Sequence, residues 1–265
     1  MAVPFDHIDA KDDSVLSPFE IGQFQRKQAW DYISKITPEL NGLEILELNC
    51  GDGDDALLFG DKDFNIVATD LSSEMQKITQ ANGSHYSLQR TISTRYLDLE
   101  NFNDTLFQKK FDLIFSNFGG LNSIGPERLK KFLDKIPQVL SPGGRFVALI
   151  MPRFCLWESM YFLYRFQFKN VFRRWTKKEV MPYLKDSTAN TWFYNPSELR
   201  EWTKNKFKVK QIRPVGFALP PLCLESLFTS RKRLLLRLNT IEKRIIALPL
   251  FSRMSDNFLI DLQLA

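Results

Sequence analysis

The sequence contains few of the residues that hold metal ions or form disulfide bridges: two histidines and three cysteines among 265 residues. His7 and His85 are far apart in the sequence and neither lies near a cysteine, so no metal site is expected. Cys50, Cys155 and Cys223 form no C-x-x-C pair and leave an odd count. Such scattered cysteines favour reduced thiols over a disulfide framework.

Long apolar runs are also absent. No stretch approaches the roughly 20 consecutive apolar residues with which a helix spans a bilayer. The first residues, MAVPFDHIDAKDD, are acidic and contain neither a basic leader nor an apolar stretch. Together with the cysteine usage, these absences predict a cytoplasmic protein.

Charge is distributed unevenly, although the net charge is only +5. Residues 1–150 contain 15 basic and 22 acidic residues, a net charge of −7, whereas the remainder contains 21 and 9, a net charge of +12. A basic second half can meet nucleic acid or anionic lipid, and it can equally consist of the solvated faces of helices. Charge alone leaves these interpretations open.

Short apolar segments alternate with segments of helical character through the first part of the chain. The predicted strands cover 43–48, 65–70, 95–99, 111–117 and 145–151. The first predicted helix begins near Pro18, within the capping box Ser17–Glu20. The next two begin near Ala56 and after a cap at Ser72 or Ser73. The last runs from Pro126 to Leu140 and is followed by a turn at 141–144. Alternating strands and helices require right-handed crossovers and therefore predict an α/β fold with a doubly wound parallel sheet.

A glycine-rich loop, LELNCGDGDDA, follows the first predicted strand. Gly51, Gly53 and Ala56 satisfy the pattern G-x-G-x-x-G/A, and Asp70 lies 19 residues after Gly51, at the end of the second strand. A carboxylate at that place accepts hydrogen bonds from the hydroxyls of a ribose, and ligands of doubly wound sheets bind beyond the carboxyl ends of the strands. The combination predicts a cofactor that contains a nucleoside.

The charge of this loop separates two cofactors that share the geometry. A dinucleotide would place its pyrophosphate over Glu47, Asp52, Asp54 and Asp55, each of which repels it by about 1 kcal/mol per close pair in water. S-adenosylmethionine contains ribose and adenine but no phosphate, and it presents a sulfonium and an ammonium. The acidic loop therefore favours S-adenosylmethionine over NAD.

These residues resemble the first motif of the class I S-adenosylmethionine-dependent methyltransferases, approximately E-x-G-C-G-x-G, which stands here as Glu47 to Gly53 with Asn49 in place of the first glycine. The resemblance covers nearly the whole chain and is closest to a bacterial group of small-molecule methyltransferases, through FDHI, SNFGGLN, RFCLWE and DNFLIDLQ. A tyrosine common in that group near the position of Asp12 is missing. The resemblance implies a single domain over 1–265 with a Rossmann-like, seven-stranded, mostly parallel sheet. Its last strand, about 257–264, would insert antiparallel beside the sixth, about 207–213.

The resemblance also implies which residues bind the cofactor. They are Glu47, Asn49, Gly51, Gly53, Asp70, Leu71, Met75, Asp98, Leu99, Asn117 and Phe118. The first four would face the methionine part, Asp70 the ribose, the next four the adenine, and the last two the amino acid moiety or the methyl group. Each has a structural alternative: Asp98 can end a strand, Met75 can belong to the core, and Asn117 can cap a turn.

No catalytic residue is assigned. Methyl transfer from a sulfonium is an in-line displacement to which positioning contributes much, so a base is optional. For a weakly acidic hydroxyl acceptor, His7 or Glu158 could serve as the base. The alternatives are a structural histidine and a glutamate that pairs with an arginine.

Segments outside the sheet are expected to select the acceptor: an N-terminal helical cap at 1–40, a lid insertion at 152–192 and a helical insertion at 220–255. The lid segment is dense in aromatic residues interleaved with basic ones. It can cover a hydrophobic pocket, stack single-stranded nucleic acid, or form the core of a helical cap. The basic amphipathic stretch SRKRLLLRLNTIEKRIIALPLF can lie on an anionic membrane or pack against the lid.

We therefore expect a methyltransferase for a small, hydrophobic acceptor. The alternatives are a nucleic-acid methyltransferase and a protein that binds S-adenosylmethionine without catalysis. Against the first, the chain has Ser116-Asn117-Phe118-Gly119 where the enzymes that methylate exocyclic base amines have [DNS]-P-P-[YFW], and it lacks the Pro-Cys pair of cytosine carbon methylation. The sequence leaves the acceptor atom and the oligomeric state open.

Overall fold

Seven strands form one sheet in the computed structural model, which describes residues 20–37, 42–62, 64–181, 191–228 and 230–265. The strands are β1 (Glu44–Leu48), β2 (Asn65–Asp70), β3 (Ile92–Tyr96), β4 (Phe111–Ser116), β5 (Leu140–Ile150), β6 (Phe207–Val215) and β7 (Asn257–Leu264). Their order is β3-β2-β1-β4-β5-β7-β6, and β7 runs antiparallel to both β5 and β6. The remaining neighbours are parallel. The predicted doubly wound sheet with an antiparallel last strand is confirmed.

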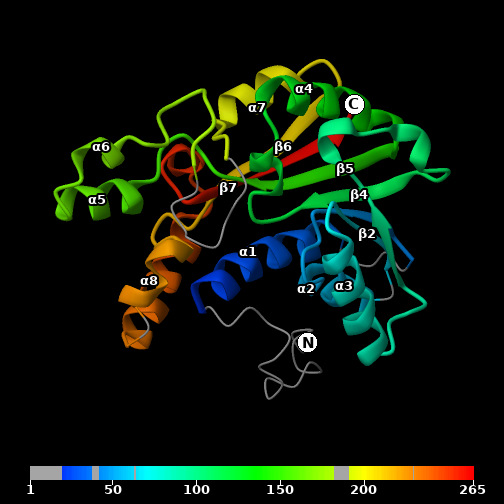
Figure 1. Cartoon of the computed structure of the whole chain (residues 1–265), viewed down its shortest axis with the longest axis horizontal. Helices are drawn as coiled ribbons and strands as arrows, with labels where there is room; N and C mark the ends of the chain where they lie inside the picture. Colours follow the sequence, from blue (N-terminus) through cyan, green and yellow to red (C-terminus); the bar gives the residue numbers. More distant parts are fainter. Residues whose placement is uncertain (1–19, 38–41, 63, 182–190, 229) are drawn as a thin grey trace.

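Helices cover both faces of this sheet (Figure 1). The α-helices are α1 (Glu20–Ile36), α2 (Asp54–Gly60), α3 (Ser73–His85), α4 (Pro126–Lys135), α5 (Leu156–Tyr164), α6 (Phe168–Val171), α7 (Pro196–Thr203) and α8 (Lys232–Ile245). Short 3-10 helices are η2 (Leu99–Asn101), η3 (Asp104–Leu106), η4 (Gly120–Ser123), η5 (Ile136–Gln138), η6 (Leu222–Leu227) and η7 (Pro249–Arg253). Helices α1 and α2 pack into one apolar core, and α4 and α7 into the core on the opposite face. Among the described residues, no helix is long and apolar enough to cross a membrane.

The central strands are apolar on both faces because successive side chains of a strand point in opposite directions. Ile45 and Phe115 belong to the core on the α1 side, whereas Leu46 and Ile114 belong to the core on the α4 side. All four side chains are buried. Because β1 and β4 are parallel neighbours, their carboxyl ends lie side by side in the middle of the sheet, where a ligand of this fold binds.

Two predicted strands have different bounds in the structure. The strand predicted at 95–99 is Ile92–Tyr96, because the Asp98 side chain accepts from the backbone N–H of Glu100 at 2.9 Å and starts η2. The strand predicted at 145–151 begins at Leu140. Its expected turn at 141–144 lies within the strand, where the pairing with β4 shifts register between Phe111 and Leu113.

Two predicted helices also differ at their ends. The helix predicted over 126–140 starts at Pro126 as expected, but it ends at Lys135 and gives way to η5, in which Pro137 has no backbone N–H to continue it. Helix α2 begins at Asp54 rather than Ala56, immediately after Gly53. The capping box predicted at 17–20 lies outside the described residues, apart from the backbone of Glu20.

The segments predicted to select the acceptor contain α5 and α6 within 152–192, and η6, α8 and η7 within 220–255. Figure 1 shows α5, α6 and α8 at the same end of the molecule. A third apolar cluster joins them: Ile21 of α1 packs with Leu224, Phe228 and Leu235, and Trp157 of α5 packs against this cluster.

Candidate cofactor and active site

The loop after β1 contains three residues with positive φ: Asn49 (58°), Gly51 (56°) and Gly53 (90°). Gly53 is required by packing, because a Cβ there would lie 2.7 Å from Cγ2 of Thr79 on α3. Gly51 differs, since nothing lies within 4 Å of a Cβ built on it. The backbone at Gly51 is therefore open to the close approach of a ligand.

Asp70 lies directly against this loop. Its Oδ2 accepts from the backbone N–H of Gly51 at 3.0 Å, and its Oδ1 accepts from the backbone N–H of Ser72 at 2.8 Å. Ser72 in turn caps α3 by accepting from the Met75 N–H at 3.3 Å, as predicted. A carboxylate has about four lone-pair sites, so the half-buried Asp70 keeps capacity for further donors beside the open backbone of Gly51.

Part of the negative charge of the loop is compensated within the protein. Arg26 of α1 lies 2.8 Å from Asp54. Asp55 accepts from Trp30 Nε1 at 2.5 Å and from Asn117 Nδ2 at 3.0 Å. Asp54 and Asp55, two of the four carboxylates that would repel a pyrophosphate, are thus paired with protein groups and belong to the local structure.

Glu47 is the most unusual of the remaining acidic groups. It is 1% exposed, and its Oε2 has no hydrogen-bond partner in the described part of the chain. Burial, reinforced by Asp55, raises the pKa of Glu47 well above its usual value, while Arg26 acts in the opposite direction. A buried carboxyl with an unsatisfied oxygen is stabilised by a nearby positive charge. The site thus fits a ligand that brings an ammonium or a sulfonium.

The end of β4 meets this loop because Leu48 pairs with Ser116 in the parallel ladder. Asn117 is buried, and its Oδ1 accepts from the Phe118 N–H at 2.9 Å while its amide donates to Asp55. Phe118 has φ 39°, and its ring lies 5.1 Å from the Arg26 guanidinium. Asn117 and Phe118 therefore lie beside the start of α2 and Arg26, and their contact with the amino acid moiety or the methyl group of a cofactor stays a prediction.

The residues expected around an adenine lie at the carboxyl ends of β2 and β3. Leu71 is 56% exposed, and Met75 is half-buried in the first turn of α3. Asp98 caps η2 and also accepts from Asn101 Nδ2 at 2.6 Å, with Leu99 buried behind it. Asp98 therefore takes part in the local structure that follows β3, and its contact with an adenine stays a prediction.

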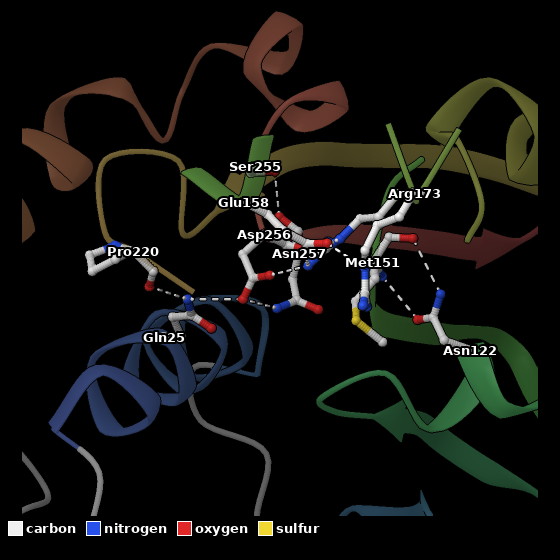
Figure 2. Close-up of polar contacts among 10 residues, drawn as sticks. Gln25, Asn122, Met151, Glu158, Arg173, Pro220, Ser255, Asp256 and Asn257 are labelled. Atoms are coloured by element: carbon white, nitrogen blue, oxygen red, sulfur yellow. Dashed lines mark hydrogen bonds and ion pairs between the residues drawn. The ribbon is translucent and has the colours of Figure 1, made fainter. Parts of the chain in front are cut away.

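Two site residues have no clear signal in the sequence. Arg26 is one charge on a mixed helix, and only the packing of α1 brings it to the acidic loop. Asn122 joins the exits of β4 and β5. Its Oδ1 accepts from the Met151 N–H at 2.9 Å, and its amide donates to the Met151 carbonyl at 3.2 Å (Figure 2). The same amide donates to the carbonyl of Trp192 at 2.6 Å. The motif SNFGGLN contains Asn122, but its spacing does not show which strand it would contact.

The candidate bases have different outcomes. His7 lies outside the described residues. Glu158 is buried and forms ion pairs of 2.6 Å with Arg173 and with Arg174, and Arg174 also pairs with Asp256 at 3.0 Å. Figure 2 shows this polar cluster between α5 and the start of β7, next to Gln25 of α1. Glu158 thus takes its structural alternative and ties the 152–192 segment to the sheet.

Comparison with known proteins gives the class of this site. Residues 45–144, from β1 into β5, match the family model described as "Methyltransferase domain". None of the curated proteins matches the sequence.

Solved structures share the fold over almost the whole chain. A S-adenosylmethionine-dependent methyltransferase from Clostridium acetobutylicum ATCC 824 is 15% identical, with 98% of each chain covered and a TM-score of 0.58. The magnesium protoporphyrin IX methyltransferase of Synechocystis PCC 6803, solved with bound S-adenosylhomocysteine, is 10% identical, with 92% of this chain and 84% of that chain covered and a TM-score of 0.58. A methyltransferase from Mesorhizobium loti is 16% identical, with 88% and 96% covered and a TM-score of 0.56. At these identities the likeness concerns the fold.

The family match covers the glycine loop, Asp70 and the end of β4, which are the parts of the site described above. Residues 45–144 therefore form a methyltransferase domain, and the chain as a whole has the fold of S-adenosylmethionine-dependent methyltransferases. Both findings support a S-adenosylmethionine-dependent methyltransferase with S-adenosylmethionine as its cofactor.

Proposed function

We propose that the acceptor of this methyltransferase is a small, hydrophobic molecule and that the cofactor is held at the loop after β1. The proposed cofactor-binding residues are Glu47, Asn49, Gly51, Gly53, Asp70, Leu71, Met75, Asp98, Leu99, Asn117 and Phe118. One observation carries the cofactor site: the open backbone of Gly51 is bonded to Asp70 at 3.0 Å, and the unsatisfied buried Glu47 lies at the start of the same loop.

When bound, the cofactor supplies an electrophilic methyl group on a positively charged sulfur. Glu47 compensates positive charge from the buried side, where few water molecules compete with it. Asp70 accepts from ribose hydroxyls and fixes the register of the nucleoside. Phe118 and the Asn117 backbone form the side of the site at the end of β4, and Arg26 and Trp30 of α1 contact Asp54 and Asp55 next to it. Because an in-line displacement depends on alignment, these positioning groups contribute without an ionisable catalyst.

A cavity of about 550 Å³ beside the exit of β5 supports the acceptor class. Its volume lies in the usual range for small-molecule sites, about 300–1,000 Å³. Phe154 and Trp175 line it with rings whose centroids are 5.8 Å apart, and Arg153, Lys177 and Arg253 add positive charge. Arg153 is paired with Glu198 at 2.8 Å. The lining favours an acceptor with an apolar body and an acidic substituent.

The proposal is tested by incubating cell extract with the protein and S-adenosylmethionine that carries a deuterated methyl group, followed by mass spectrometry. The expected products are small, apolar molecules that gain one labelled methyl group. Lys177→Ala should raise KM for an acidic acceptor, whereas Lys178→Ala, at the exposed neighbour that does not line the cavity, should not. Labelling confined to nucleic acid or to protein would contradict the acceptor assignment.

A further inference from the structure

The segment over α5 and α6 exposes many large apolar side chains. Tyr164 is 82% exposed and Phe166 is 80% exposed, and Met160, Leu163 and Phe168 are each more than half exposed. Soluble monomers rarely present so many large apolar groups together, and such patches mark surfaces that meet another apolar phase. We call the exposed side chains of 160–172 the lid surface.

The charged groups of the lid surface are all basic. From Ser159 to Lys178 the sequence contains no aspartate or glutamate, while Arg165 and Lys169 are interleaved with the aromatic residues. Both are exposed, and neither forms an ion pair within the described part of the chain. The lid surface therefore combines exposed rings with uncompensated positive charge.

Helix α8 adds a second basic face at the same end of the molecule (Figure 1). Its inner side packs through Leu235 and Glu242, and the Glu242 carboxylate accepts backbone N–H groups of 216–219 at 2.5–3.2 Å. Because the single acidic residue of α8 points inward, the charges on its outer side are all positive: Arg233, Arg237, Lys243 and Arg244. Leu234 and Leu236 are exposed beside them.

We propose that the lid surface and the outer face of α8 dock this protein on an anionic lipid bilayer. Exposed aromatic and aliphatic side chains beside lysine and arginine are the composition of elements that lie in the membrane interface. A single-stranded nucleic acid would share the positive charge and the rings, but the exposed Met160, Leu163, Leu234 and Leu236 offer it no stacking partner. An acyl-chain boundary accommodates both kinds of apolar group.

The positive charge of both surfaces also favours an anionic bilayer. Each lysine or arginine near an anionic leaflet contributes about a five-fold gain in partitioning, and the contribution decays within a Debye length of about 10 Å at 0.1 M salt. Neither the apolar nor the electrostatic contribution to membrane binding is sufficient alone. Binding to the bilayer should therefore be reversible and should weaken with salt.

The test is co-sedimentation of the full chain with vesicles of phosphatidylcholine alone and with 30% phosphatidylserine at about 0.1 M salt. Binding is expected only to the anionic vesicles. The double variant Arg233→Ser, Arg237→Ser should lower the partition coefficient about 20- to 30-fold. Its matched control, Lys208→Ser, Lys210→Ser, removes two exposed charges from β6 and should change partitioning less than three-fold.

A second pair of variants tests the contribution of the exposed apolar side chains to membrane binding. Tyr164→Ser with Phe166→Ser should lower partitioning about ten-fold or more, whereas Leu106→Ser, at an exposed leucine on η3, should leave it unchanged. All seven side chains changed in these variants are exposed, so circular dichroism melting should show folded proteins. No binding to anionic vesicles would overturn the proposal. Tighter binding to single-stranded RNA through the same arginines, or a dimer that buries Tyr164 and Phe166, would also overturn it.

Discussion

Gly51 and Gly53 lie in the same loop with positive φ, yet an alanine should affect a different property at each. Gly53→Ala should mainly lower the stability of the protein, and Gly51→Ala should mainly lower its affinity for the cofactor. At Gly53, an alanine adds about 1–2 kcal/mol for the left-handed backbone. The contact of its Cβ with Thr79, 2.7 Å away, adds a further 1–3 kcal/mol, roughly, for overpacking. Gly53→Ala should therefore lower the free energy of unfolding by about 2–5 kcal/mol. Gly51→Ala meets nothing within 4 Å and should lower it by only about 1–2 kcal/mol.

Cofactor affinity should reverse this ranking. The Cβ of Gly51→Ala would stand on the open backbone beside Asp70, where the cofactor approaches, so affinity for S-adenosylhomocysteine should fall at least about ten-fold, or 1.4 kcal/mol. Urea unfolding and isothermal titration calorimetry on both variants measure the two effects separately. A folded Gly51→Ala variant with wild-type affinity would refute the reasoning, because the open glycine would then face only solvent.

Three further outcomes follow from the site and its surroundings. Asp70→Ala should weaken cofactor binding by about 1.5–3 kcal/mol, and unchanged affinity in a folded variant would place the ribose elsewhere. Because burial raises the pKa of Glu47, the free protein keeps this proton above pH 4.5, and the affinity for cationic S-adenosylmethionine should rise with pH from 4.5 towards the raised pKa. Calorimetry should show a flat profile for Glu47→Gln, and an equally steep one would contradict this. Glu242→Ala leaves the N–H groups of 216–219 without their acceptor and should cost at least about 3 kcal/mol of stability by urea unfolding, where a loss under about 1 kcal/mol would disagree.

The sheet could be predicted because its strands are locally marked. NIVATD reads as a buried strand ended by Asp70, and β2 covers those residues. Boundaries were harder where a side chain competes with the backbone pattern. Asp98 reads as the exit of an apolar strand, but its carboxylate accepts from Glu100 and ends the extended segment. The resemblance supplied β6 and β7, which local patterns alone did not distinguish.

The loop of the site could be predicted, but its electrostatics could not. The spacing of Gly51 and Asp70 placed both residues at the carboxyl ends of neighbouring strands, and in the structure Asp70 accepts from the Gly51 N–H at 3.0 Å. The contact of Asp70 with a ribose stays a prediction. The pairing of Asp54 with Arg26 depends on how α1 packs across the sheet, which no local spacing encodes. The same holds for Trp157 within the predicted lid insertion at 152–192: its Nε1 donates to the Phe217 carbonyl at 3.0 Å, a contact between two distant segments.

The assignment of the cofactor site is tested most directly by calorimetric titration of the pure protein with S-adenosylmethionine, S-adenosylhomocysteine and NAD in one buffer. We expect the first two to bind, both to lose affinity in Asp70→Ala, and NAD not to bind. The open backbone of Gly51 lies beside acidic groups that suit a cation and repel a pyrophosphate. Comparable binding of NAD, or no binding of S-adenosylmethionine to a folded protein, would contradict this assignment.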